Sequence, residues 1–216
     1  ETITKKAQGQ GRYKKQTGGR GQYGDCWLRL APRTRGEGFE FVSKIVGGVI
    51  PSKFVPAVGK GVQEALSRGI LAGYPVVDVA VECYDGSYHA VDSSEQAFKV
   101  AGSMAFQKVA RDARPIILEP ILEVEVRTPE EFMGEVIGDL NQRRGRIMGM
   151  EADGHWQVVK AKVPQAEMYR YSTALRSLTQ GKGAHARDLS GYEPAPADVT
   201  QKIIAEAEAR KEEEHR

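Results

Sequence analysis

Apolar and polar residues alternate along much of the first third of the chain, as they do in half-buried β-strands. Cys26, Leu28 and Leu30 are separated by single residues, and a second alternating stretch follows at 39–45. Val77, Val79 and Val81 alternate with other residues in the stretch 76–84. The pattern therefore predicts β-strands in all three stretches.

Two stretches have the spacing of amphipathic helices, with apolar residues at every third or fourth position. The first, 54–72, is expected to end at Gly73-Tyr74-Pro75, because proline disfavours helical geometry in the residue before it. Asp85-Gly86 predicts a turn, and Asp92 or Ser93 is expected to cap the second helix. The predicted buried stripes are Val58, Val62, Leu66 and Ile70, then Phe98, Ala101, Ala105 and Val109.

A change of composition between Pro115 and Pro120 indicates a domain boundary, which we place near residue 117. The pattern beyond it predicts the order β-α-β-β-α-β, the split βαβ arrangement of a ferredoxin-like domain. Thr128 and Glu131 predict a capping box at the first helix of this domain. The expected ranges are 118–127, 129–142, 145–152, 156–163, 165–180 and 184–190.

A final helical run carries Val199, Ile203 and Ala207 on one stripe and then becomes wholly polar. Its early turns are expected to pack on a domain surface, and its last turns to be solvated. The fold class is therefore predicted as α+β with two domains.

Composition is typical of a folded protein, with 40% hydrophobic and 28% charged residues among 216. No apolar run approaches the ~18 residues that a membrane span requires. Cys26 and Cys83 lack the number and spacing of a disulfide framework or metal site, which favours a reducing, cytoplasmic location. Because Glu1 is not methionine and already begins a strand-like stretch, we expect a fragment of a longer protein.

Charge is distributed unevenly, although the net charge of the whole chain is only +2. Residues 1–35 contain nine basic and two acidic residues, a net charge of +7. Such a cluster favours an anionic partner, of which a nucleic-acid backbone is the commonest. A solvated strand face is the alternative interpretation.

The sequence offers little support for catalysis. It lacks the GxxxxGK[ST] motif of a phosphate-binding loop, and its four histidines have no zinc-ligand spacing. His89 lies near Asp92 and Glu95, but no nucleophile accompanies them. We expect no catalytic site, metal or cofactor within these residues.

Two loops carry groups suited to RNA contact. The first, "QTGGRGQYG" at 16–24, combines glycines that allow close backbone approach with groups that bind phosphate, hydrogen-bond and stack. The second, "GSYH" at 86–89, is similar, and both are expected at the same end of the fold. A neutral hairpin turn is the alternative for the first loop. In the first loop Arg20 can pair with phosphate, Gln22 can hydrogen-bond to a base or ribose edge, and Tyr23 can stack on a base.

Several long stretches resemble the C-terminal part of the bacterial elongation factor G family. They are "ETITKKAQGQGRYKKQTGGRGQYG", "GFEFVSKIVGGVIP", "AGYPVVDVAVECYDGSYHAVDSSEQAFKVAGSMAF", "LEPILEVEVRTPEEFMGEVIGDLNQRRGRI" and "RSLTQGKG". The resemblance implies the fourth domain in 1–117 with the final helix 197–216, and the fifth domain in 118–196. It also implies a left-handed βαβ crossover in the fourth domain, which most folds avoid.

The resemblance also implies a role in protein synthesis. The tip of the fourth domain is expected to enter the decoding site of the small ribosomal subunit and contact the codon–anticodon helix during translocation of tRNA and mRNA. The residues of this chain that match the tip, and are the predicted contacts, are Gly18, Gly19, Arg20, Gly21, Gln22, Tyr23, Ser87, Tyr88 and His89. The fifth domain would face the large-subunit factor-binding region, with Arg143, Arg144 and Arg146 as candidate contacts. GTP and Mg²⁺ would bind an N-terminal G domain outside these residues. The expected state is a cytoplasmic monomer without a membrane partner.

Other functions remain open. Asp25 stands where histidine or valine is common in the family, and Ala90 where an acidic residue is common. These departures are compatible with a paralogue that acts in ribosome recycling. A small-molecule enzyme is a further alternative, because certain metabolite kinases share the fourth-domain fold. A stand-alone ribosome-associated protein is the last.

Overall fold

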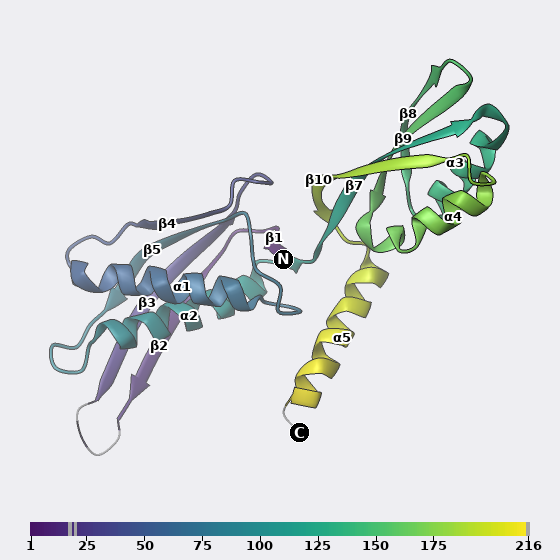
Figure 1. The fold of residues 1–216 in the computed structure, drawn as a ribbon. Helices are drawn as coiled ribbons and strands as arrows, with labels where there is room; N and C mark the ends of the chain where they lie inside the picture. The colour runs from purple at the N-terminus through teal and green to yellow at the C-terminus, as the bar shows by residue number, and fades with distance from the viewer. Residues whose placement is uncertain (17–18, 20, 215–216) are drawn as a thin grey trace. The chain divides into compact units, whose positions relative to one another are not determined.

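A computed structural model describes residues 1–16, 19 and 21–214, without the side chain of Glu214 (Figure 1). The chain divides into two units. One consists of Glu1–Ile117 and Ala195–Arg216, and the other of Leu118–Pro194. None of the described helices is long and apolar enough to cross a membrane.

A four-stranded sheet with the order β2-β3-β5-β4 forms the framework of the first unit. Its strands are β2 (Ala7–Lys15), β3 (Gln22–Pro32), β4 (Phe39–Ser43) and β5 (Val79–Ser87). β2, β3 and β5 are antiparallel neighbours, whereas β4 and β5 are parallel. A separate short pair joins β1 (Thr2–Ile3) to β6 (Pro115–Ile116).

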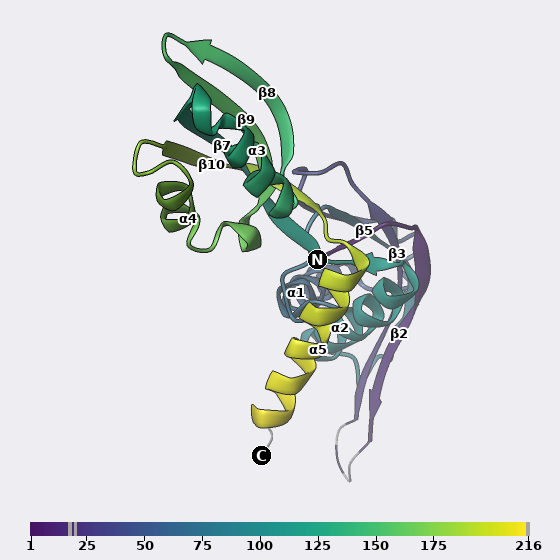
Figure 2. The same cartoon turned by 90° about the vertical axis from the view of Figure 1, so that its right-hand side faces the viewer.

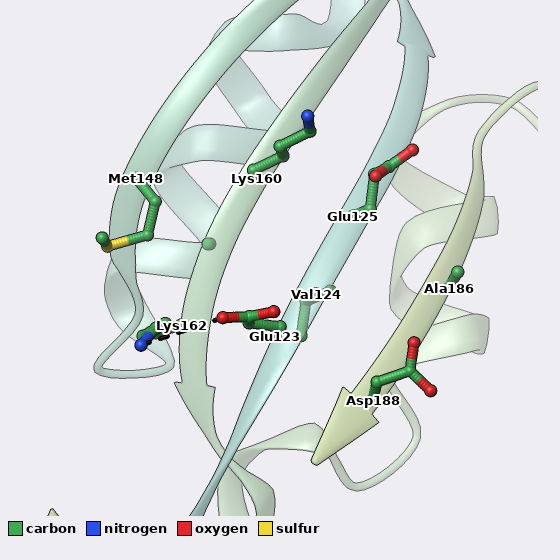
Figure 3. A pocket seen from close by; sticks show the side chains of 9 residues that line it. Glu123, Val124, Glu125, Met148, Lys160, Lys162, Ala186 and Asp188 are labelled. Atoms are coloured by element: carbon green, nitrogen blue, oxygen red, sulfur yellow. Dashed lines mark ion pairs between the residues drawn. The ribbon is translucent and has the colours of Figure 1, made fainter. Parts of the chain in front are cut away.

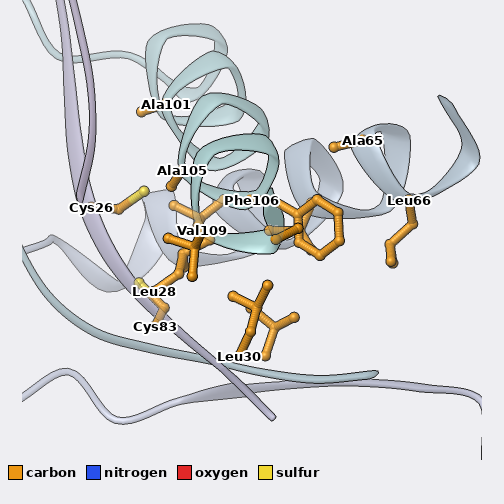
Figure 4. Close-up of a cluster of buried hydrophobic side chains, with 14 of the residues drawn as sticks. Cys26, Leu28, Leu30, Ala65, Leu66, Cys83, Ala101, Ala105, Phe106 and Val109 are labelled. Carbon is orange, nitrogen blue, oxygen red and sulfur yellow. The ribbon is translucent and has the colours of Figure 1, made fainter. Parts of the chain in front are cut away.

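Helices α1 (Val55–Arg68) and α2 (Glu95–Asp112) cover one face of this sheet (Figures 1 and 2). Seven of the eight residues in the two predicted stripes are buried, and Ile70 is partly buried beyond the end of α1. Their side chains meet the sheet residues Cys26, Leu28, Leu30 and Cys83 in one core (Figure 4). The sequence therefore predicted this core correctly.

The β4-α1-β5 segment is the crossover that the parallel pairing requires. A 3₁₀ turn, Ser52–Phe54, leads into α1. The helix ends at Arg68, four residues before the predicted end, because Gly69 adopts a φ of 73° that stops it. The left-handed sense of the crossover, implied by the family resemblance, stays a prediction.

Two predictions about the segment before α2 were wrong. Asp85-Gly86 is not a turn but part of β5, where Gly86 pairs with Cys26 of β3. A Cβ on Gly86 would lie 2.3 Å from the carbonyl oxygen of Asp25, so glycine serves strand packing here. The cap of α2 is Ser94, whose Oγ accepts the Ala97 amide at 3.1 Å, rather than Asp92 or Ser93.

The last helix, α5 (Ala197–Glu214), belongs to the first unit. Ala207 is buried and Ile203 partly buried in a small cluster with Ala72 and Ile117. The predicted packing of its early turns is therefore confirmed.

The second unit has the strand order β10-β7-β9-β8, all antiparallel. This is the 4-1-3-2 order of a ferredoxin-like sheet and confirms the predicted β-α-β-β-α-β sequence. Two 3₁₀ turns, Glu130–Phe132 and Gln165–Met168, precede the helices. The elements are β7 (Leu118–Pro129), α3 (Met133–Gln142), β8 (Arg146–Asp153), β9 (Trp156–Pro164), α4 (Tyr171–Leu178) and β10 (Ala184–Pro194).

The predicted capping box at Thr128 was wrong. Thr128 is fully buried within β7, and its hydroxyl contacts the Pro129 carbonyl oxygen at 3.4 Å. The chain begins the 3₁₀ turn at Glu130 without a side-chain cap, so burial of the strand residue overrides the local capping signal.

Candidate nucleic-acid interface

Backbone hydrogen bonds join the start of β3 to the loop that follows β5. The Tyr23 amide donates to the Asp92 carbonyl oxygen at 2.9 Å, and the Ser93 hydroxyl donates to the Tyr23 carbonyl oxygen at 2.9 Å. Ser93 Oγ also accepts the His89 amide at 2.9 Å. The described parts of the two predicted loops therefore lie at one end of the sheet, where β2 ends and β3 begins (Figure 1).

A groove of about 310 Å³ lies between these segments. Tyr23 forms part of its wall, with its ring centroid 6.3 Å from that of His89 and 5.4 Å from the Arg12 guanidinium carbon. Cationic and aromatic groups thus surround one hollow, an arrangement suited to a phosphate and a base or ribose. Residues that line it include Arg12, Lys14, Lys15, Tyr23, Tyr88 and His89.

The basic residues of the N-terminal segment divide into two groups. Arg29 pairs with Glu82, Arg33 with Glu37 and Glu40, and Arg35 with Asp78. In contrast, none of the described carboxylates forms an ion pair with Arg12, Lys14 or Lys15 of β2, nor with Lys5 and Lys6, which precede this strand. The part of β2 that borders the groove therefore carries three cations without a described ion-pair partner.

The predicted tip residues differ in what they present to solvent. Gly18 and Arg20 lie outside the described residues, and Gly19 is exposed. Gly21 approaches Asp92 so closely that a Cβ would lie 2.9 Å from its carboxyl carbon. The exposed Gln22 accepts the Tyr13 hydroxyl through Oε1 at 2.8 Å, which leaves its amide hydrogens for a ligand.

The second loop contributes one inward and two outward side chains. Ser87 is half-buried, and its hydroxyl is hydrogen-bonded within the protein to Asp25 at 2.6 Å. Tyr88 is 50% exposed. His89 is exposed, and its Nδ1 lies 3.4 Å from the Asp92 carboxylate.

The sequence counted Arg12, Lys14 and Lys15 as charge but did not place them in the site. In β2, Arg12 and Lys14 lie opposite Asp25 and Tyr23, whereas Lys15 lies opposite Gln22. The short spacing of "GRYKK" to the glycine-rich loop was the available signal, since a hairpin returns its second strand beside its first.

The predicted contacts of the second unit are held by internal ion pairs. Arg144 makes a two-point contact with Glu119 at 3.1 and 2.6 Å, which raises its pKa, and Arg143 binds Asp139 at 2.8 Å. Arg146 binds Glu193 at 2.7 and 2.8 Å. Their role as large-subunit contacts stays a prediction. The ion pairs give these arginines a role in holding the second unit together.

A second hollow, of about 320 Å³, lies on the sheet of the second unit (Figure 3). Its lining contains the carboxylates of Glu123, Glu125 and Asp188 together with Lys160 and Lys162. Lys162 pairs with Glu123 at 3.8 Å, and Lys160 pairs with Glu151 at 2.9 Å. Its lining carries no excess of positive charge, so it suits a polyanion less well than the groove in the first unit does. Across the described residues, no group of three potential ligands is placed to bind a metal ion.

Comparison with known proteins gives consistent matches. The family model of elongation factor G, domain IV, matches residues 1–114, and that of the elongation factor G C-terminus matches 116–203. Elongation factor G of Aquifex pyrophilus is 60% identical over 211 residues, which cover 98% of this chain and 30% of that protein. A crystal structure from Thermus thermophilus matches 96% of this chain and 31% of its own, with a TM-score of 0.86 and 50% identity. The chain thus spans about a third of the length of these relatives.

Proposed function

This chain belongs to the elongation factor G family, and on that basis we propose that it is a ribosome-binding module of a translation elongation factor. Its tip, formed by Gly18–Tyr23 and Ser87–His89, enters the decoding site of the small subunit and contacts the paired codon and anticodon. The module thereby promotes movement of tRNA and mRNA through the ribosome. GTP and Mg²⁺ act in a G domain outside these residues.

The observation that carries the proposal is the groove at the tip. The cations of β2 that form no described ion pair line it together with the rings of Tyr23 and His89. Cations supply attraction to RNA phosphates, whereas aromatic rings and amide groups contact nucleosides. Both kinds of group are needed at a site that touches paired RNA.

Binding at this site makes the tip a mechanical element. The described parts of the two loops are tied together by the hydrogen bonds among Tyr23, His89, Asp92 and Ser93, so these parts can occupy space as one body. A body that fills the vacated part of the decoding site opposes backward movement of the paired RNAs. The step requires no bond to be made or broken by these residues.

The test is a chimera in which this chain replaces the matching 211-residue segment of Aquifex pyrophilus elongation factor G. Gln22→Ala or His89→Ala should slow single-round translocation roughly ten- to a hundredfold, the effect of losing about 1.4–2.7 kcal/mol of interaction energy. GTP hydrolysis should stay nearly unchanged, because its site lies elsewhere in the factor.

Gln63→Ala and His155→Ala are matched controls, since both residues are exposed and lie outside the groove. Equal loss of translocation and hydrolysis in the tip variants would contradict the proposal. A defect confined to the splitting of ribosomes after termination would assign the module to recycling instead.

A further inference from the structure

A buried carboxylate lies directly beneath the tip groove. Asp25 is 5% exposed, and two side chains from neighbouring strands donate to it. Gln10 Nε2 of β2 lies 2.7 Å from Oδ1, and Ser87 Oγ of β5 lies 2.6 Å from Oδ2. No described cation forms an ion pair with it. These two bonds therefore carry much of the compensation for its burial.

The direction of the hydrogen bonds extends this anchor to Tyr23. A serine hydroxyl has one proton, and as a carboxylate Asp25 can only accept, so Ser87 donates to Asp25. The Tyr23 hydroxyl lies 2.7 Å from Ser87 Oγ and must then be the donor in that contact. A chain of donors thus runs from Tyr23 through Ser87 to Asp25.

Tyr23 is consequently fixed at both ends. Its phenol is held by the chain to Asp25, and its backbone is held by Asp92 and Ser93. The ring between these points borders the groove beside His89. Because the hydroxyl donates to Ser87 and the Arg12 guanidinium lies over the ring, the part of the ring that borders the groove is what Tyr23 offers to a ligand.

We infer that Asp25 is a positioning residue that holds the Tyr23 ring as the surface against which a nucleoside of the bound RNA packs. The inference rests on the proposed function, since it concerns the same groove. A positioning role and a purely electrostatic role predict opposite changes in RNA affinity when Asp25 is removed. Removal of a carboxylate near a polyanion should strengthen binding by charge alone, whereas loss of positioning weakens it.

The experiment measures binding of the 216-residue chain to an anticodon stem-loop RNA paired with its codon, by fluorescence anisotropy. Asp25→Ala should weaken binding by roughly three- to tenfold, in line with couplings in hydrogen-bonded networks. Asp85→Ala is the matched control: it removes the same charge from an exposed site on β5, where the carboxylate accepts the amide of its neighbour Gly86. This control should bind equally well or more tightly.

A double-mutant cycle shows whether Asp25 acts through Tyr23. In a Tyr23→Ala background, Asp25→Ala should weaken binding no further, because only the effect of its charge remains. Tyr23→Phe, which keeps the ring and loses the hydroxyl, should weaken binding less than Tyr23→Ala. If Asp25→Ala does not fold, Tyr23→Phe still tests the anchor, because it removes the hydroxyl that links the ring to Ser87 and Asp25.

Failure of this inference is distinguishable from failure of the proposed function. If Tyr23→Ala weakens binding but Asp25→Ala does not, or if the two effects add fully, the positioning role is wrong and the tip contact stands. If Tyr23→Ala binds as well as the unaltered chain, no nucleoside packs on this ring and the inference is wrong, whereas the translocation assay of the Gln22 and His89 variants still decides the tip contact. Amide hydrogen exchange of Tyr23 and His89 in the free chain tests the anchor separately. Asp25→Ala should accelerate it, and unchanged exchange would overturn the inference.

Discussion

Gly24 allows β3 to cross α2 at very close range. A Cβ at this position would lie 2.4 Å from the Ala97 carbonyl oxygen and 2.6 Å from its carbonyl carbon. Both are backbone atoms of a helix, so a larger residue requires the helix or the strand to move. The last glycine of the "QTGGRGQYG" stretch therefore serves packing, unlike the exposed Gly19.

Gly24→Ala should lower the free energy of unfolding by about 1–3 kcal/mol, the usual cost of overpacking. Gly138→Ala is the opposite control, because nothing lies within 4 Å of a Cβ built there and alanine favours helices by ~1 kcal/mol. Urea unfolding should show a lower free energy of unfolding for Gly24→Ala and a higher one for Gly138→Ala. Equal stability of the Gly24 variant and the unaltered chain would contradict the close contact.

Asp78 stabilises the turn between β3 and β4 in a way that depends on pH. Burial alone would raise its pKa, but hydrogen bonds from the Gly38 amide, the Arg35 guanidinium and the Gly36 amide outweigh this and hold the pKa below its ordinary value. Because the folded pKa is lowered, the stabilisation is fully present above the ordinary value of 3.8. It is lost as pH falls from there through the folded pKa.

Asp78→Asn should therefore cost about 1–3 kcal/mol of unfolding free energy at neutral pH. The difference from the unaltered chain should stay constant down to about pH 5 and shrink as the medium becomes more acidic. Asparagine tolerates the φ of 56° at this position, so the backbone is preserved. Denaturant unfolding over a pH series measures it, with the exposed Asp188→Asn as control. A gap that persists unchanged into acid would contradict the assignment.

Local patterns predicted the elements of this fold well, but not all of their ends. The strand alternation and the helical stripes located the core, because buried residues recur along each strand and helix at the period of that element. The pattern failed at Gly86, where pairing with β3 extends β5 through a dipeptide that usually turns. It failed again at Thr128, whose burial in β7 is a tertiary effect.

The candidate site was predictable only in part for the same reason. Charge and loop composition located the tip, whereas the pairing of Arg29, Arg33 and Arg35 depends on carboxylates from other elements. The anchor of Tyr23 on Ser87 joins residues 64 positions apart. Contacts of this kind require the sheet register, which the sequence alone does not supply.

The junction of α3 and β8 offers a test of structural against binding roles for arginine. Arg144→Ala leaves the carboxylate of Glu119, itself only 10% exposed, without its two-point partner. We expect a loss of about 1–3 kcal/mol of unfolding free energy. Arg146→Ala removes a pair in which the arginine side chain is 60% exposed and should cost at most ~1 kcal/mol. Thermal and urea unfolding compare the two, and an equal effect would contradict the distinction.

Within the sheet of the first unit, cations that are paired with carboxylates and cations without such a partner lie at different places. Arg29 and Arg33 are matched by carboxylates, whereas Lys14 and Lys15 are not, within the part of the chain that the structure describes. RNA bound at the tip should therefore release counterions mainly through its interaction with Lys14 and Lys15.

The salt dependence of RNA binding measures this segregation. For a single-stranded RNA, replacing Lys14 and Lys15 by alanine should reduce the slope of log affinity against log salt by about 1.4, at ~0.7 for each phosphate that is no longer neutralised. Replacing Arg29 and Arg33 should change it little. Equal changes in both double variants would mean that the RNA does not bind at the tip.

Tethered cleavage of ribosomal RNA tests the central claim most directly. The two thiols of this chain should react little, because Cys26 and Cys83 are buried and burial raises the pKa of both, that of Cys83 to about 12; any exposed cysteine in the rest of the chimera is replaced by serine. A Gln22→Cys variant of the chimera can carry an iron chelate at the tip, with Lys60→Cys on the exposed side of α1 as control. On ribosomes, the tip chelate should cleave decoding-site RNA of the small subunit, and the control should not. Cleavage elsewhere, or the same pattern from both positions, would contradict the proposed placement of the tip.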